Sequence, residues 1–276
     1  MERELNELRE TISSGEAILF TGAGFSLGMR DRTGRALPSS DEMADDLWRL
    51  VFGDDTRDDS TLTDLFDVAL RTHPAEVRAY LGERFAVGDH VPPPHVIAWL
   101  SARWRRIYTL NVDDLEAAVM RTAHLPHELR SLSALGPRAD DVCASGRCDP
   151  PPMIDVVHLN GMAGCDVEQV TFSTLQYAAR LCDRQPAYEQ LAHDLEHAPF
   201  VFVGTTLDEV VLWQHVMSRS KRGQGGTPPR SFLVTRALAR ARAVLLEAFG
   251  IVWLPIAAED AATALWGDAV APVAAR

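Results

Sequence analysis

The chain has 276 residues, 46% of them hydrophobic and 24% charged, so it can bury a sizeable core as one large domain spanning 1–276. Its 27 basic and 39 acidic residues give a net charge of −12, which disfavours binding to nucleic-acid phosphates or anionic membranes. No apolar stretch approaches the roughly 20 residues that cross a bilayer, and residues 1–16 are charged rather than signal-like, so we expect a cytoplasmic protein with no membrane partner and no direct nucleic-acid partner.

Apolar periodicity predicts helices and strands that alternate along the chain. Residues 2–12 carry leucine and isoleucine at helical spacing and lead into a short, continuous apolar run, the pattern of a buried parallel strand. The predicted strands are 17–21, 107–111, 154–158, 200–204, 232–235 and 251–255, and the later helical stretches are 115–122, 175–197, 209–218 and 236–249. The alternation predicts an α/β fold with a Rossmann-like, doubly wound parallel sheet of about six strands.

The block between the first two predicted strands is too long for a simple crossover. Residues 31–103 are therefore predicted to form an inserted small helical subdomain, with its clearest helices at 41–51 and 61–71. A second irregular stretch, 136–152, is rich in proline and charge and predicts a surface loop.

A glycine-rich segment follows the first predicted strand, where doubly wound folds bind nucleotides. It reads Thr21-Gly-Ala-Gly-Phe-Ser26 and includes Gly22, Ala23 and Gly24. Glycine lets the backbone approach a ligand closely, and the N–H groups of a following helix N-terminus would attract a pyrophosphate. A strand-to-helix turn without a ligand can use the same residues.

Polar residues follow the second strand. If the chain stays extended, Thr109, Asn111 and Asp113 share one face and could orient a ribose, a carboxamide or a water. The alternative is a helix cap by Asp113 or Asp114 ahead of the helix at Leu115.

Two more strand ends carry groups suited to chemistry. His158 and Asn160 lie two residues apart before Gly161, and histidine is the side chain best suited to accept a proton near neutral pH. A lone histidine at a strand end is more often structural. After the strand at 200–204, the turn at Gly204, Thr205 and Thr206 suits a phosphate or a ribose hydroxyl, or else leads to a helix cap by Asp208.

These four segments, in this order, resemble the signature of the sirtuin family over nearly the whole chain. The resemblance implies a Rossmann-like NAD-binding domain with a smaller inserted module. It places Asn111 and Asp113 at the nicotinamide end of NAD and makes His158 the base. It assigns NAD binding to the residues Gly22, Ala23, Gly24, Ser26, Thr109, Asn160, Gly204, Thr205 and Thr206. Family histidines directly precede the glycine, a place held here by Asn160; we prefer His158 as the base because an amide takes up no proton.

The chain departs from the deacylase branch of that family. Residues 27–33 replace the usual loop after the first motif, and Leu110 stands where glutamine is usual. The cysteines form no Cys-x-x-Cys pair, so we expect no metal; they are Cys143, Cys148, Cys165 and Cys182. The sequence looks closer to prokaryotic sirtuin-like domains of antiphage defence systems, which hydrolyse NAD.

The resemblance therefore implies an NAD+ glycohydrolase that releases nicotinamide and ADP-ribose as the effector of a defence system. It also implies a homo-oligomer and a separate sensor partner, such as an Argonaute-type protein or a translocase ATPase. Two alternatives remain open: an NAD-dependent protein deacylase, and a module that senses NAD or ADP-ribose without turnover. The choice between NAD and NADP, and between hydrolysis and cyclisation, is also open.

Overall fold

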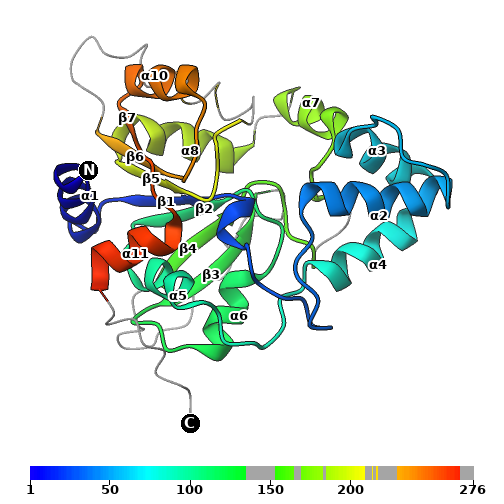
Figure 1. The fold of residues 1–276 in the computed structure, drawn as a ribbon, viewed down its shortest axis with the longest axis horizontal. Helices are drawn as coiled ribbons and strands as arrows, with labels where there is room; N and C mark the ends of the chain where they lie inside the picture. Colours follow the sequence, from blue (N-terminus) through cyan, green and yellow to red (C-terminus); the bar gives the residue numbers. More distant parts are fainter. Residues whose placement is uncertain are drawn as a thin grey trace.

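The core of the molecule is a parallel sheet of seven strands in the order β3-β4-β2-β1-β5-β6-β7 (Figure 1). The computed structural model describes residues 1–134, 153–164, 169–182, 185–208, 213, 216 and 229–267. The strands are β1 (Ile18–Thr21), β2 (Arg106–Thr109), β3 (Glu128–Ser133), β4 (Met153–His158), β5 (Phe200–Val203), β6 (Ser231–Val234) and β7 (Ile251–Leu254). The α/β fold with a parallel, Rossmann-like sheet is confirmed, and the six predicted strands all form. The seventh strand, β3, is an edge strand that pairs only with β4.

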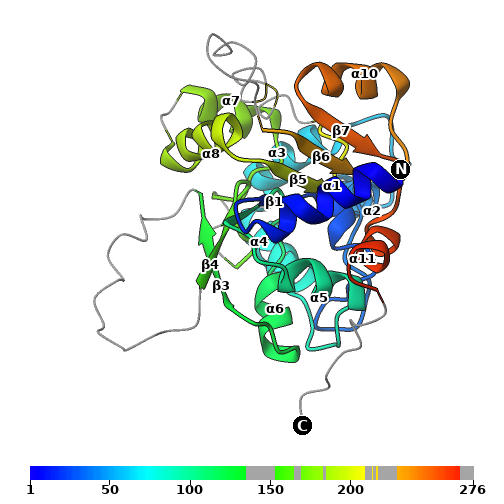
Figure 2. The ribbon, with the colours of Figure 1, turned by 90° about the vertical axis from the view of Figure 1, so that its left-hand side faces the viewer.

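Helices cover both faces of the sheet (Figures 1 and 2). One face packs against α1 (Glu2–Ser13), α5 (Pro94–Ser101), α6 (Leu115–Thr122) and α11 (Ala258–Trp266). The other face packs against α8 (Pro186–His197) and α10 (Arg240–Ala248). Because β1, β5 and β6 are buried on both faces, their sequences are mostly apolar and do not alternate; the polar residues are Thr21 at the end of β1 and Ser231 at the start of β6.

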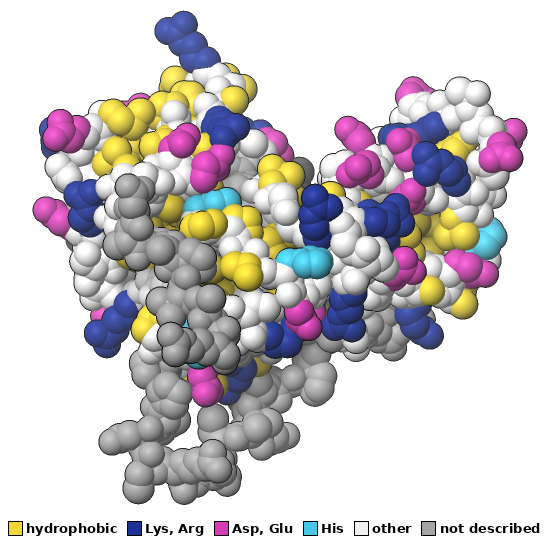
Figure 3. Space-filling model, turned by 60° about the horizontal axis from the view of Figure 1, so that its bottom comes forward, with side chains coloured by type: hydrophobic (Ala, Val, Ile, Leu, Met, Phe, Trp, Pro, Cys, Tyr) yellow, Lys and Arg dark blue, Asp and Glu magenta, His cyan; other side chains and the backbone are white. Residues whose placement is uncertain are grey.

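Three further helices form a module beside the sheet, drawn at the right of Figure 1. They are α2 (Ser40–Phe52), α3 (Leu62–Thr72) and α4 (Pro74–Arg84), which share their own apolar cluster. Val170 and Phe172 join this cluster from a later part of the chain, ahead of α7 (Thr174–Cys182). Helix α5 lies within the predicted insertion 31–103 but packs on the sheet. In Figure 3 the module is a separate lobe at the right with intermixed acidic and basic side chains.

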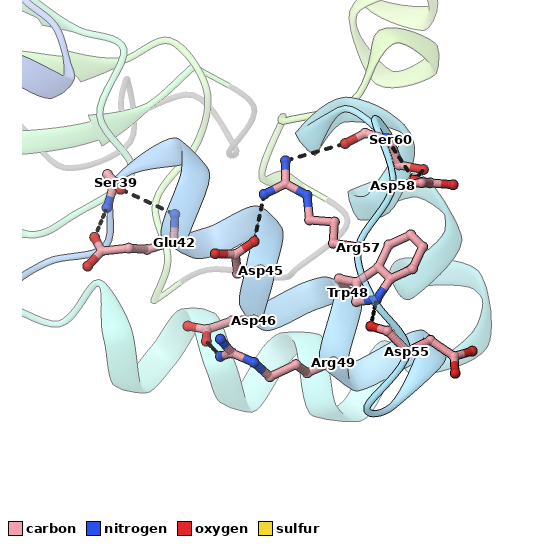
Figure 4. A network of polar contacts seen from close by, with 10 residues as sticks. All are labelled: Ser39, Glu42, Asp45, Asp46, Trp48, Arg49, Asp55, Arg57, Asp58 and Ser60. Atoms are coloured by element: carbon pink, nitrogen blue, oxygen red, sulfur yellow. Dashed lines mark hydrogen bonds and ion pairs between the residues drawn. The ribbon is translucent and has the colours of Figure 1, made fainter.

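A capping box fixes the start of α2 (Figure 4). The Ser39 hydroxyl accepts a hydrogen bond from the Glu42 N–H, and the Glu42 carboxylate accepts one from the Ser39 N–H at 2.8 Å. The loop after α2 is tied back by Trp48 Nε1, which donates to the Asp55 carbonyl, and by the Arg57–Asp45 ion pair. The module therefore holds the segment at Ser39 in a defined place near the sheet.

Three predictions of elements need correction. The stretch 175–197 forms two helices rather than one, because Pro186 cannot continue a helix and instead starts α8. Helix α11 was not foreseen. No α-helix follows the glycine-rich turn directly; a short 3₁₀ turn, η1 (Ala23–Phe25), takes its place. The loop at 136–152 and most of the helix at 209–218 lie outside the described residues.

The strand order reverses direction at the pair β1 and β5, since β2 and β4 lie on one side of β1 while β6 and β7 lie beyond β5. In open parallel sheets the crevice beyond the carboxyl ends of strands at such a point is where ligands bind. Within the described residues, no helix is long and apolar enough to span a membrane.

Candidate functional site

Two cavities lie at the carboxyl ends of β1, β2 and β5. The first, of about 450 Å³, lies between the sheet and the helical module and is lined by Ser26, Asn111 and Asp113 together with residues of α2 and Phe172. The second, of about 510 Å³, is lined by the turn after β5, by the end of β6 and the residues after it, and by the start of α11. Each lies in the range of about 300–1,000 Å³ typical of small-molecule sites. Ala23, Gly24 and Leu27 line both cavities, so the two meet at the glycine-rich turn.

The glycines after β1 and β5 pack against one another. The Gly24 N–H donates to the Gly204 carbonyl at 2.8 Å, and the Gly22 N–H donates to the Val203 carbonyl. A Cβ at Gly24 would lie 2.9 Å from the Gly204 carbonyl oxygen, and one at Gly204 would lie 2.2 Å from the Phe25 nitrogen. The packing of the two loops thus explains these glycines without a ligand, and the N–H groups of Gly22 and Gly24 are already engaged. The expected α-helix N-terminus is therefore absent here, and the N–H groups of Gly22 and Gly24 are not available to a pyrophosphate.

Asn111, Ser26 and Asp113 form a polar cluster in the first cavity. The chain turns after β2 because the Thr109 hydroxyl accepts the Asn111 N–H at 3.0 Å, so the extended conformation does not persist. The Asn111 side chain donates through Nδ2 to the Ser26 hydroxyl at 2.9 Å, and Ser26 hydrogen-bonds the Asp113 carboxylate. Asn111 and Asp113 thus line the same cavity, although the chain turns here and does not keep the extended conformation on which the prediction depended. Thr109 lies beneath them, in a cavity of about 20 Å³ that Asn111 and Asp113 also line.

The two aspartates before α6 have separate partners. Asp113 accepts the Leu115 N–H at 3.2 Å while it lines the cavity. Asp114 instead accepts the Val87 N–H at 2.6 Å and lies 3.8 Å from Arg32. Burial, and after it the negative charge of Glu116, raises the pKa of Asp113 to about 6. The cavity therefore contains a carboxyl group that changes charge just below neutral pH.

His158 does not reach either cavity. Its side chain is fully buried, with Nδ1 3.0 Å from the Asn111 carbonyl and Nε2 2.6 Å from Glu116 Oε1. It is the last residue of β4 and has the same strand parity as Ile154 and Val156, which pack in the cluster beneath α5 and α6. The imidazole therefore points toward α6, behind the cavity wall.

Asn160 is a structural residue of the next turn. Its Nδ2 donates to the Leu110 carbonyl at 3.0 Å, and its Oδ1 accepts from the Tyr177 hydroxyl at 3.2 Å. It lies among the lining residues of neither cavity. The chain turns after β4, where the Gly161 N–H donates to the His158 carbonyl at 3.3 Å, and the side chains of His158 and Asn160 have different partners.

The turn after β5 contributes two threonines to the wall of the second cavity. Thr205 and Thr206 both line it, and the Thr205 hydroxyl accepts the Leu207 N–H at 3.0 Å. Leu207 has a φ of +56°, rare for a residue with a side chain, and its carbonyl accepts hydrogen bonds from Trp213 and Arg242. Asp208 pairs with Arg242 at 2.9 Å.

Several residues of the site have no counterpart in the sequence predictions. Glu116 is one; its signal was a glutamate among the apolar positions of a short helix, where it is buried. The second cavity also contains His95 and an ion pair between Arg236 and Glu259. These charged groups come from segments that only the folded sheet brings together. Among the described residues, no group of acidic, histidine or cysteine side chains is arranged to hold a metal ion, while the side chains of the four cysteines fall outside the described part.

The fold and the site together define an α/β protein with a bipartite crevice at the switch point of a doubly wound sheet. No family model matches the chain, and a search of curated proteins finds no significant match. The function therefore has to be argued from the residues of the crevice.

Proposed function

We propose that the crevice binds NAD and that the protein cleaves the bond between nicotinamide and ribose. The nicotinamide riboside would occupy the cavity with Asn111 and Asp113, and the adenosine would occupy the cavity with Thr205 and Thr206. The observation that carries the proposal is that the two cavities meet at one glycine-rich turn, because a dinucleotide needs two linked compartments. A ligand across the turn would also cover Leu27, an apolar side chain left 69% exposed there.

The polar cluster suits the charge that develops in this reaction. Loss of nicotinamide leaves an oxocarbenium-like sugar, which an adjacent carboxylate stabilises. Asp113, with a pKa of about 6, is mostly ionised at neutral pH and would face that charge. Since Nδ2 of Asn111 is bonded to Ser26, the amide oxygen is the end that would hold a water or a ribose hydroxyl.

The test is incubation of the purified protein with NAD, with products separated by chromatography. We expect nicotinamide and ADP-ribose without any added peptide; a requirement for an acylated peptide would indicate a deacylase instead. Asp113→Asn should lower kcat by about 10²–10³, the usual loss when a group that stabilises the transition state is removed.

Asp114→Asn is the matched control for that substitution. Asp114 is the adjacent aspartate, does not line the cavity, and would keep an oxygen for the Val87 N–H after substitution. We expect it to retain activity near that of the unmodified protein. Equal losses in the two variants would remove Asp113 from the reaction.

The second candidate function is NAD or ADP-ribose binding without turnover. It is favoured by one observation: both ring nitrogens of His158 are engaged away from the cavities, so the histidine that the family resemblance makes the base does not meet a ligand. Calorimetry that measures tight NAD binding, together with no nicotinamide release, would select this function.

The defence role, self-association and a sensor partner are part of the same proposal. They rest on the resemblance of the four motifs. Native mass measurement with parallel assays of NAD loss would test them, since a monomer with full activity alone would need neither an oligomer nor a partner.

A further inference from the structure

A chain of buried polar groups runs from β3 to the cavity. The Ser131 hydroxyl donates to Glu116 Oε1 at 2.5 Å, and the same oxygen lies 2.6 Å from His158 Nε2. The other ring nitrogen lies 3.0 Å from the carbonyl oxygen of Asn111. The polar groups of His158 and Glu116 are almost completely withdrawn from solvent.

The partners of His158 fix the protons on its ring. A carbonyl oxygen only accepts hydrogen bonds, so Nδ1 has to carry a proton and donate it to Asn111. Burial alone would lower the pKa of His158, but the charge and hydrogen bond of Glu116, the Asn111 carbonyl and the charge of Asp113 together raise it to about 9. At neutral pH the ring is an imidazolium with both protons engaged, and it has no lone pair with which to accept another.

We propose that His158 is a positioning residue, which holds the backbone of Asn111 from behind the cavity with Glu116 as its counter-ion. This inference rests on the proposed NAD reaction. The effect reaches the cavity through Asn111, whose side chain donates to Ser26, which in turn bonds the Asp113 carboxylate. His158 thus acts on the site without touching the ligand, and Asp113 is the group in the cavity that changes its protonation.

Two substitutions, each of which places an amide nitrogen where one of the two ring nitrogens stood, test the inference. In His158→Asn the amide nitrogen takes the place of Nδ1 and can still donate to the Asn111 carbonyl, but it cannot take up a proton. In His158→Gln the amide reaches toward Glu116 instead, so the bond to Asn111 is lost.

For a positioning residue we expect His158→Gln and His158→Ala to lose about 100-fold in kcat, the scale of a displacement of about 1 Å at a reacting centre. His158→Asn should stay within about tenfold of the unmodified protein, because the donor to Asn111 is restored. If His158→Asn is folded and as inactive as His158→Ala, His158 is a base and the inference fails.

Each single variant leaves Glu116 buried without its counter-ion and can fail to fold. The double variant His158→Asn, Glu116→Gln removes both charges while it keeps hydrogen-bonding groups at both places. We expect it to fold and to keep activity above that of His158→Ala; a folded double variant without this gain would overturn the inference.

A measurement without turnover separates this inference from the proposed function. Nitrogen-15 NMR of labelled histidine should find both ring nitrogens of His158 protonated from pH 6 to pH 8. A neutral ring that titrates in this interval would contradict the positioning role even in an active enzyme. An imidazolium signal in a protein that leaves NAD intact would instead refute the proposed reaction alone.

Discussion

At the scale of single residues, one histidine and one aspartate have opposite relations to the cavity. His158 follows the strand parity of Val156 and is turned toward α6, whereas Asp113 follows the end of β2 and lines the cavity. The sequence could predict that both lie at the same sheet edge. Strand parity gives the face of the sheet on which the imidazole lies, but the sequence could not predict its partner Glu116, which comes from a helix with no polar motif.

The protonation of Asp113 predicts a pH dependence of activity. Burial and the charge of Glu116 raise its pKa to about 6, against the hydrogen bonds of Ser26 and Leu115 and the positive charge of His158. We therefore expect log kcat for NAD cleavage to fall with a slope of one below about pH 6. Initial rates from pH 4.5 to 8 would measure this, and a flat profile through pH 6 would contradict the role of the carboxylate.

The same shift has a consequence for stability with a definite sign. A carboxyl group whose pKa is raised on folding binds protons more tightly in the folded state than in the unfolded state. The contribution of Asp113 to stability therefore becomes more favourable as the pH falls from about 6 toward the ordinary pKa of an aspartate. The unfolding free energy of Asp113→Asn should therefore exceed that of the unmodified protein most at pH 7–8, and the difference should shrink toward pH 4. If the difference in unfolding free energy between Asp113→Asn and the unmodified protein grew as the pH fell, the raised pKa of Asp113 would be contradicted.

At the scale of elements, the central strands and the edge strand β7 were predictable, whereas the edge strand β3 was not. Strands such as β1 and β5 are buried on both faces, and their apolar runs predict a buried strand from the sequence alone. Strand β3 reads Glu-Leu-Arg-Ser-Leu-Ser, which is only partly buried and pairs on one side, so it carries no such run. The same holds for the site. The sequence predicted the residues at the strand ends, but it did not predict the groups that the helical module and α11 bring to the cavities.

The packed turns after β1 and β5 predict a strong effect of one methyl group. In Gly204→Ala the added Cβ would lie 2.2 Å from the Phe25 nitrogen, at a φ of +68° that disfavours alanine. We expect a clear loss of stability, measured by denaturant unfolding, together with loss of NAD binding.

Gly82→Ala is the control. Gly82 is an exposed residue of α4 whose added Cβ would meet nothing within 4 Å, so alanine should stabilise the protein by about 0.5–1 kcal/mol. A harmless Gly204→Ala would mean that the two turns are not tightly packed.

At the scale of the whole molecule, a buried ion pair ties the helical module to the loop that leads from β1 to α2. Asp31 is fully buried and pairs with Arg84 of α4, and it also accepts hydrogen bonds from Thr33 and Arg35. Arg84 donates as well to the Ala36 carbonyl at 2.9 Å. Ala36 lies in the wall of the first cavity, so this pair ties the shape of the cavity to the position of the module.

Removal of Asp31 should therefore affect both stability and affinity. Asp31→Ala leaves Arg84 buried without its counter-charge, which typically costs about 3–5 kcal/mol. We expect a lower midpoint of denaturant unfolding, faster hydrogen exchange in residues 29–40 and a raised KM for NAD. The double variant Asp31→Ala, Arg84→Met removes the unpaired charge and should recover much of the stability. Unchanged exchange in residues 29–40 of Asp31→Ala would show that the pair does not hold this wall.

The contact between Gly24 and Gly204 also determines when the crevice can form during synthesis of the chain. The ribosome releases β1 early, but the turn that packs against Gly24 follows β5, which begins at Phe200, and the second cavity also needs the start of α11 at Ala258. A nascent chain that has formed only the first strands has one side of the binding crevice and lacks the other. The proposed binding and cleavage of NAD would therefore have to wait until most of the polypeptide has emerged and folded.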